Sequence, residues 1–266
     1  MKILFCLSAR LGDVICGIPA YLALREKYKD ADLSWLTLPQ YVPLIPKCGK
    51  TVPYGSPPYG GIPPWARPPE YDIVIKAQPM WRHTEWEKSR LHIIDLISKW
   101  SGVTPRKKRI YIDIPPEDTE HVQKIIPKQP FITICSSPCY SSANWPYEER
   151  TTIARTLLKR GIPIITVGGS DGKEIPGTIS AHGKLNYTQT IALINLSKLY
   201  IGPDTGVTWL ACAARNAKKI CLIDKNRLKQ GMTGYQTILT EKNITDIYYQ
   251  DGAQKHIDII NKTWNS

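Results

Sequence analysis

The segment that decides the fold is Leu199-Tyr-Ile-Gly-Pro-Asp-Thr-Gly-Val-Thr-Trp-Leu-Ala-Cys-Ala-Ala214. A short apolar run ends at Gly202 and Pro203, and an Asp-Thr-Gly turn follows it. Apolar side chains then recur at helical spacing, at Val207, Leu210, Ala211 and Ala214. This order predicts a strand, a tight turn and a helix.

The turn formed by Asp204, Thr205 and Gly206 suits an anion. Asp204 and Thr205 fall at or beside a helix N-cap, where backbone N–H groups without helical partners point outward, and Gly206 allows a ligand to approach closely. An ordinary capped helix explains the same residues. Asp-Thr-Gly also occurs at the catalytic aspartate of aspartic proteases, but those proteins are all-β, and the helical run after Gly206 argues against that class.

The composition is that of a globular chain with a basic excess. Of 266 residues, 42% are hydrophobic and 22% charged, and the formal net charge is +12. This charge predicts attraction to an anionic partner; no nucleic-acid-reading motif is recognised, so nucleic acid is not expected. The seven cysteines, an odd number, and five scattered histidines indicate neither a disulfide framework nor a metal site. No apolar run is long enough to cross a bilayer, so we expect a cytoplasmic location.

The first residues predict a parallel α/β sheet. Residues 1–7 indicate a buried strand, and Gly12 and Asp13 precede a periodic apolar helix with Pro19 in its first turns. A second strand at residues 33–37 completes a β-α-β unit. Ligands of such sheets bind at the carboxyl ends of strands, where Gly12 and Asp13 lie. Alternatively, Asp13 only caps the helix.

Two prolines after residues 110–114 mark a boundary, so we predict two Rossmann-like domains, 1–115 and 116–266. Residues 39–69 are rich in proline, glycine and tyrosine and are expected to form a long loop with little regular structure.

Polar turns also follow two predicted strands of the second domain. The strand at residues 131–135 is followed by Ser136 and Ser137, and the strand at residues 163–167 by Gly168 and Gly169. The glycine turn is not a Walker phosphate loop, because the required glycine spacing and Lys-Ser/Thr pair are missing.

Four motifs, taken in order, resemble those of one family. They are Leu11-Gly12-Asp13-Val14-Ile15 with Ile18-Pro19-Ala20, Asn144-Trp145-Pro146, Val167-Gly168-Gly169-Ser170-Asp171, and Gly202-Pro203-Asp204-Thr205-Gly206. Each motif alone is weak. The ordered set resembles the heptosyltransferases of glycosyltransferase family 9 over most of the chain.

The resemblance implies an α/β GT-B fold, in which two Rossmann-like domains face a central cleft. The first domain would hold the acceptor and the second a nucleotide sugar. Family members use ADP-heptose, need no metal or other cofactor, and invert the anomeric centre, as in lipopolysaccharide biosynthesis. We expect the acceptor to be an anionic surface glycan or glycolipid, with the basic protein drawn to the inner membrane face.

The resemblance also implies roles for individual residues. Asp13 matches the general base that takes the proton of the acceptor hydroxyl, with Arg10 and Gly12 beside the acceptor. The residues matching the donor site are Asp204, Thr205 and Gly206 at the diphosphate, Ser136 and Ser137 at a second phosphate-binding turn, and Gly168, Gly169, Asp171 and Lys184 around the base and ribose.

Three positions depart from the family pattern. Ala143 stands where a lysine usually contacts the diphosphate, Trp209 where a histidine often stands, and Gly172 where an acidic residue often holds the ribose. Asp171 or Glu174 would have to replace that acid. The basic loop after residue 224 contains Lys225 and Arg227, and our hypothesis is that one or the other replaces the lost cation.

Two alternatives follow from these departures. The chain is a GT-B transferase that uses a different nucleotide sugar, or it is a catalytically weak module that binds a nucleotide or glycan.

Overall fold

Two units, each built on its own parallel sheet, make up the described part of the chain. The computed structural model describes every residue except 9, 54–69, 90, 138–144 and 227–233. The first unit lies within Met1–Asp113, and the second within Ile114–Gln230 and Gly234–Ser266. No helix of the described residues has the length and apolar character needed to cross a membrane.

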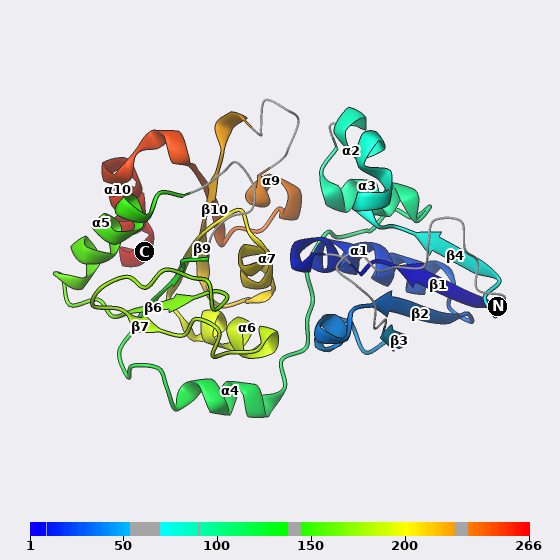
Figure 1. Ribbon diagram of the computed structural model, residues 1–266, viewed down its shortest axis with the longest axis horizontal. Coiled ribbons are helices and arrows are strands. Elements are labelled where there is room, and N and C mark those ends of the chain that lie inside the picture. The colour runs from blue at the N-terminus through cyan, green and yellow to red at the C-terminus, as the bar shows by residue number, and fades with distance from the viewer. Residues whose placement is uncertain (9, 54–69, 90, 138–144, 227–233) are drawn as a thin grey trace. The chain divides into compact units, whose positions relative to one another are not determined.

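The first unit begins with a strand, a helix and a strand, as its sequence predicts. Its elements are β1 (Lys2–Cys6), α1 (Leu11–Lys27), β2 (Asp32–Thr37), η1 (Pro39–Leu44), β3 (Lys50–Pro53), β4 (Ile73–Lys76), η2 (Pro79–Arg82), α2 (His83–Ser89) and α3 (Ile93–Trp100). The strands are all parallel, in the order β3-β2-β1-β4 (Figure 1).

Aromatic side chains join α1 to this sheet. The rings of Phe5 and Trp35 meet edge to face, with 4.8 Å between centroids, and Tyr21 of α1 packs 4.8 Å from Trp35. The Trp35 indole N–H donates to Leu7 O at 2.9 Å, so this buried ring leaves no polar atom unpaired. This packing fixes the position of α1 relative to β1 and β2.

Two predictions for this unit are wrong. Pro19 lies inside α1 and not in its first turns, because the helix begins at Leu11, earlier than the apolar pattern suggests. The stretch predicted as an irregular loop contains η1 and β3, and β3 pairs with β2 from Lys50 to Pro53. Proline is tolerated there because it ends the strand. Residues 54–69 of the predicted loop lie outside the described residues.

The second unit alternates helices and strands. Its elements are α4 (Pro116–Gln123), β5 (Ile132–Cys135), α5 (Tyr147–Leu158), β6 (Ile164–Val167), β7 (Ile179–Ser180), α6 (Tyr187–Leu196), β8 (Leu199–Pro203), α7 (Gly206–Ala213), β9 (Lys218–Ile223), α9 (Tyr235–Leu239), β10 (Ile244–Tyr248), η3 (Tyr249–Asp251) and α10 (Ala253–Asn265).

The six strands of this unit are parallel, in the order β10-β9-β8-β5-β6-β7. The chain therefore runs outward from β5 to β7, returns to the other side of β5 at β8, and continues to β10. The strand order reverses between β5 and β8, and ligands of open parallel sheets bind at the carboxyl ends of strands at such a point.

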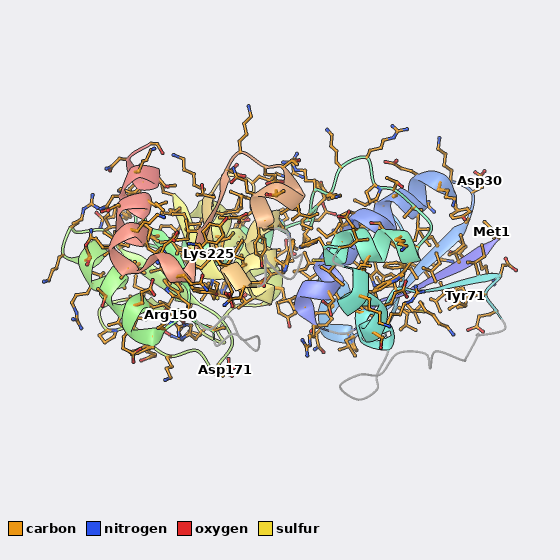
Figure 2. All side chains as sticks on the ribbon, turned by 90° about the horizontal axis from the view of Figure 1, so that it is seen from above. Met1, Asp30, Tyr71, Arg150, Asp171 and Lys225 are labelled. Atoms are coloured by element: carbon orange, nitrogen blue, oxygen red, sulfur yellow. The ribbon has the colours of Figure 1, made fainter. Side chains whose placement is uncertain are left out.

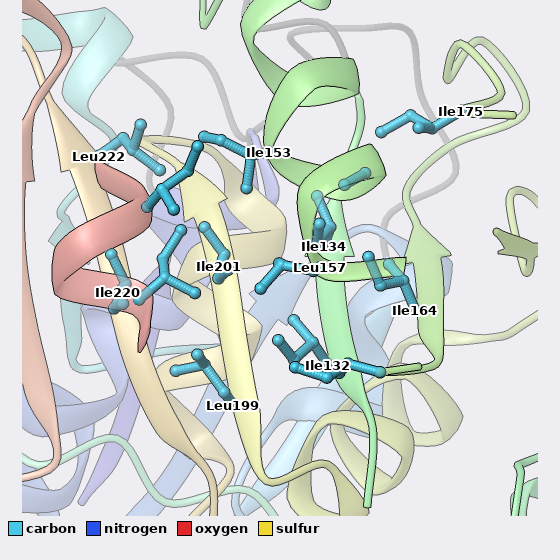
Figure 3. Close-up of a cluster of buried hydrophobic side chains, with 14 of the residues drawn as sticks. Ile132, Ile134, Ile153, Leu157, Ile164, Ile175, Leu199, Ile201, Ile220 and Leu222 are labelled. Atoms are coloured by element: carbon cyan, nitrogen blue, oxygen red, sulfur yellow. The ribbon is translucent and has the colours of Figure 1, made fainter. Parts of the chain in front are cut away.

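Branched aliphatic side chains fill the space between this sheet and two helices. Ile132 and Ile134 of β5 and Ile201 of β8 pack under Ile153 and Leu157 of α5, as Figure 3 shows. In Figure 1, α5 and α10 lie on one side of the sheet and α6 and α7 on the other. Burial on both faces explains why the strands read as continuous apolar runs.

The described cysteines are free thiols, as expected. Cys6, Cys16, Cys135, Cys212 and Cys221 are buried and Cys48 is exposed. Cys139 lies outside the described residues.

Candidate functional site

The Asp-Thr-Gly turn joins β8 to α7 at the point where the strand order reverses. Thr205 is the N-cap of α7, and its hydroxyl oxygen accepts the backbone N–H of Thr208 at 3.4 Å. Asp204, Thr205 and Gly206 are each half-buried, whereas Pro203 before them is buried. The first N–H groups of a helix lack carbonyl partners, and the helix dipole adds positive charge there. The turn is therefore an accessible place for an anion.

The serine turn follows β5, the strand next to β8. Ser136 is 1% exposed, and its hydroxyl is hydrogen-bonded to His182 Nε2. Arg150 of α5, labelled in Figure 2, donates from Nη1 to Ser136 O at 2.7 Å. The Ser136 side chain is thus turned into the protein.

Ser137, in contrast, is half-buried and contacts the glycine turn after β6. Its hydroxyl oxygen accepts the Gly169 N–H at 2.9 Å, which leaves its own proton available for donation. Gly168 has φ +150°, and a Cβ there would lie 2.1 Å from Ser137 Oγ. The close approach of these two turns requires glycine at position 168.

The two predicted ribose-side residues lie on either side of β7, Asp171 between β6 and β7 and Lys184 between β7 and α6. Asp171 is exposed, and Lys184 donates from Nζ to Ser180 O at 2.9 Å. A Cβ on Gly172 would lie 3.1 Å from the ring of His182. The imidazole therefore occupies the room that a side chain at position 172 would need.

Asp13 lies in the first turn of α1, in the first unit. Arg10 is the N-cap residue, so the alternative in which Asp13 caps the helix is wrong. Asp13 and Gly12 are half-buried, and Arg10 is exposed. Burial raises the pKa of the Asp13 carboxyl from its ordinary value of 3.8 to about 6, and the charge of Arg10 opposes this shift. A carboxyl that titrates near neutrality is suited to accept a proton.

Residues 91–226, just over half of the chain, match Glycosyltransferase family 9 (heptosyltransferase). The chain belongs to glycosyltransferase family 9. The resemblance inferred from the motifs is confirmed, and the protein is a glycosyltransferase. No curated protein matches its sequence.

Solved structures of low sequence identity share the fold of this glycosyltransferase over almost all of its length. E. coli ADP-heptose LPS heptosyltransferase II is 14% identical, with a TM-score of 0.71 over 99% of this chain and 98% of that one. A family 9 glycosyltransferase from Veillonella parvula is 15% identical, with a TM-score of 0.69 over 98% and 89%. E. coli heptosyltransferase WaaC with ADP-2-deoxy-2-fluoro heptose is 13% identical, with a TM-score of 0.62 over 98% and 100%. The predicted α/β GT-B fold is confirmed.

The basic loop of the glycosyltransferase begins with a lysine that already has a partner. Lys225 Nζ lies 2.7 Å from Asp251 Oδ1 and 5.1 Å from the centre of the Tyr248 ring. Asp251 also pairs with Lys255 at 3.0 Å, so two ammonium groups share one carboxylate. Arg227, Ala143 and Asn144, which also entered the predictions, lie outside the described residues.

Two residues of the second unit were not predicted from the sequence. Arg150 is 5% exposed and lies on the inward face of α5, together with the apolar residues of that helix. The sequence could have revealed it, because a charged residue stands there at the helical spacing of buried positions. His182 has no comparable signal, because its partner Ser136 is far away in the chain.

The proton on His182 can be placed from its surroundings. Burial lowers the pKa of the imidazole below its usual 6.5, while Glu174 opposes the shift. Its Nδ1 atom is buried without a hydrogen-bond partner among the described residues. A neutral imidazole carries a proton on only one of its two nitrogens. If that nitrogen is Nε2, its N–H has an acceptor in Ser136 Oγ, so we assign His182 as the donor of this hydrogen bond.

Within the described ranges, no three histidine, cysteine or acidic side chains are arranged to hold a metal ion.

Proposed function

We propose that this glycosyltransferase moves a heptose-like sugar from an ADP-linked donor to a hydroxyl of a surface glycan or glycolipid. Family membership supports sugar transfer, and two of the similar structures are an ADP-heptose LPS heptosyltransferase and a heptosyltransferase with ADP-2-deoxy-2-fluoro heptose. The observation that carries the proposal is the half-buried Asp204–Gly206 turn, which lies at the carboxyl end of β8 where the strand order reverses.

The donor is assigned to the second unit. The free N–H groups at the start of α7 hold the diphosphate and stabilise its charge as it departs. Ser137 donates its hydroxyl proton to a phosphate oxygen, while Ser136 supports the turn from inside. Asp171 and Lys184 are assigned to the base and ribose, and Gly168 and Gly169 are assigned to the backbone that borders them.

The acceptor is assigned to the first unit, beside Arg10 and Gly12. Asp13 takes the proton of the acceptor hydroxyl as that oxygen attacks the anomeric carbon. The bond from this carbon to the diphosphate oxygen breaks, the nucleoside diphosphate leaves with the electron pair, and the anomeric configuration inverts. No metal ion is required in this scheme, and turnover in excess EDTA tests that part of it. Loss of turnover that added metal restores would overturn it.

Thermal unfolding with a panel of nucleotides tests the donor. ADP and ADP-heptose should raise Tm, with about 2.7 kcal/mol of added stability at 100 times Kd. The Asp204→Ala variant should show a smaller shift, because its ADP binding is weakened. UDP-, GDP- and dTDP-sugars serve as controls. If none of these nucleotides raises Tm, the donor assignment is contradicted.

A second candidate donor follows from Trp209. Trp209 lies in α7, at the position where the resemblance to the family leads us to expect a histidine, and a different side chain there favours a different donor. A shift with another nucleotide sugar, together with turnover of that sugar, would select this alternative over ADP-heptose.

We further propose that the reaction takes place at the cytoplasmic face of the inner membrane. The net charge of +12 supports attraction to an anionic surface. Sedimentation with anionic vesicles should be strong at low salt and weak at high salt, with neutral vesicles as the control. Equal sedimentation with both kinds of vesicle would contradict an electrostatic contact.

A further inference from the structure

A tyrosine from a distant segment is hydrogen-bonded to the donor turn. Tyr235 is the first residue of α9, and its hydroxyl donates to Asp204 Oδ1 at 2.6 Å. Tyr235 is 3% exposed and Asp204 is half-buried, so the donor side of this hydrogen bond is buried. Burial, followed by the charge of Asp204, raises the pKa of Tyr235 well above its usual value. The phenol therefore stays protonated and continues to donate throughout the physiological pH range.

Trp209 packs against this tyrosine. Its ring centre lies 4.5 Å from that of Tyr235, with the planes tilted by 41°, and Trp209 is 7% exposed. Trp209 belongs to α7, the helix that begins at the donor turn. The residue that replaces the family histidine thus supports the Tyr235 ring.

The start of α9 is fixed in turn by β10. Asp246 Oδ2 accepts the backbone N–H of Gln236 at 3.0 Å. A Cβ on Gly234 would lie 2.1 Å from the same oxygen, so the chain passes close to the Asp246 carboxylate on both sides of Tyr235. Tyr235 lies between these two anchored residues and has little freedom to move away from Asp204.

We propose that Tyr235 is a positioning residue of the donor site, which fixes the Asp204 turn through its hydroxyl and is itself held in place by Trp209. This inference rests on the proposed function, in which that turn binds a nucleoside diphosphate. A turn that is ordered before the ligand arrives loses less conformational entropy on binding. Tyr235 touches neither reacting atom in this scheme, so it acts only through Asp204.

The test is a double-mutant cycle with ADP titrated calorimetrically. Tyr235→Phe keeps the ring and should weaken ADP binding about tenfold, because a hydrogen bond to a charged group is lost. In an Asp204→Ala background the same change should have no further effect. A tyrosine that served only the stability of the fold would weaken binding equally in both backgrounds, and that result would overturn the proposal.

Two further variants separate the hydroxyl from the ring. Trp209→Phe keeps a ring against Tyr235 and should retain most of the affinity, whereas Trp209→Ala should approach the loss seen in Tyr235→Phe. Ser197→Ala is the control, since it removes a buried hydroxyl that donates to Ile194 O at 2.7 Å in the same unit. It should leave ADP affinity unchanged. Thermal unfolding without ligand confirms that each variant folds.

Steady-state kinetics give the remaining readout. Tyr235→Phe should raise the donor KM and leave the acceptor KM unchanged. An unchanged donor KM would overturn the role of Tyr235. If Asp204→Ala binds ADP as tightly as the unmodified protein, the donor site itself is wrong. If Asp204→Ala weakens binding and Tyr235→Phe does not, only the positioning role fails.

Discussion

The turn after the first strand of each sheet has the same place in the topology and a different chemistry. In the first unit β1 lies between β2 and β4, and in the second β5 lies between β6 and β8. Both turns therefore lie where the strand order reverses. The turn after β1 carries Asp13 in the first turn of a helix, and the turn after β5 carries Ser136 and Ser137. Topology gives both turns a ligand-binding position, and the side chains decide which ligand.

The electrostatic consequences differ accordingly. Asp13 brings a negative charge to a half-buried position, where burial raises its pKa to about 6 and makes it a proton acceptor near neutrality. The serine turn brings no acid, and its two hydroxyl oxygens accept N–H groups from His182 and Gly169. Of these two hydroxyls, only the half-buried Ser137 hydroxyl is placed to offer its proton to an anion. The comparison predicts base chemistry in the first unit and anion binding in the second.

The largest expected effect comes from removing the charge of the first turn. Asp13→Asn keeps the size of the side chain and should lower kcat about 10²–10⁴-fold. ADP affinity, measured by calorimetry, should not change, because the donor is assigned to the other unit. Asp30→Asn, an exposed position of the same unit, is the control. Full activity in Asp13→Asn would remove the contrast between the two turns.

The pH dependence sharpens the same contrast. If ionised Asp13 is the base, kcat/KM should fall roughly tenfold for each pH unit below about 6, while ADP affinity changes little over that range. An acid limb that persists unchanged in the residual activity of Asp13→Asn would assign the titration to another group.

The contribution of Asp13 to the free energy of unfolding should change with pH in the opposite direction to kcat/KM. Its folded-state pKa of about 6 exceeds its ordinary 3.8, so the folded protein binds more protons between these values. The contribution of Asp13 to the free energy of unfolding therefore falls as pH rises through that window. Asp13→Asn should raise Tm at pH 7 relative to the unmodified protein and lose that advantage near pH 4. An equal Tm difference at both pH values would contradict the shift.

A smaller effect is expected at the glycine beside the serine turn. Gly168→Ala forces a Cβ toward Ser137 Oγ and should cost about 1–3 kcal/mol of stability, with weaker ADP binding. Gly161→Ala is the control, because its φ of +75° is also unfavourable for alanine but nothing lies within 4 Å of its Cβ. It should destabilise without altering ADP affinity. Equal ADP affinity in both variants would show that the serine turn is not part of the donor site.

The sequence predicts the strand ends well because they depend on local patterns. Buried parallel strands read as short apolar runs, and each run that ends in a polar turn locates one edge of a sheet. Local patterns do not predict β10, because its residues Ile244–Tyr248 mix polar and apolar side chains, or β7, which has only two residues. Pro19 was misplaced because apolar periodicity does not mark the polar first turn of α1.

The supporting residues of the site could not be predicted in the same way. His182 reaches Ser136 and Tyr235 reaches Asp204 only because the sheet brings separate loops together. Neither pair has a fixed spacing or a motif. The residues proposed to contact the ligand follow strand ends, whereas the residues that hold them depend on tertiary structure.

The smallest expected effect concerns the basic loop of the second unit, which begins at Lys225. Lys225 shares Asp251 with Lys255, so the three side chains keep one net positive charge. Because this ion pair is partly exposed, Lys225→Ala should weaken ADP binding by only about 0.2–1 kcal/mol, and adding Arg227→Ala should increase the loss. Asp251→Asn should tighten binding instead, since it releases both ammonium groups from their partner. Both effects should shrink as salt rises. Unchanged affinity in Asp251→Asn and in the double lysine-arginine variant would show that the loop does not replace the family lysine, and the donor would then depend on the Asp204 and serine turns alone.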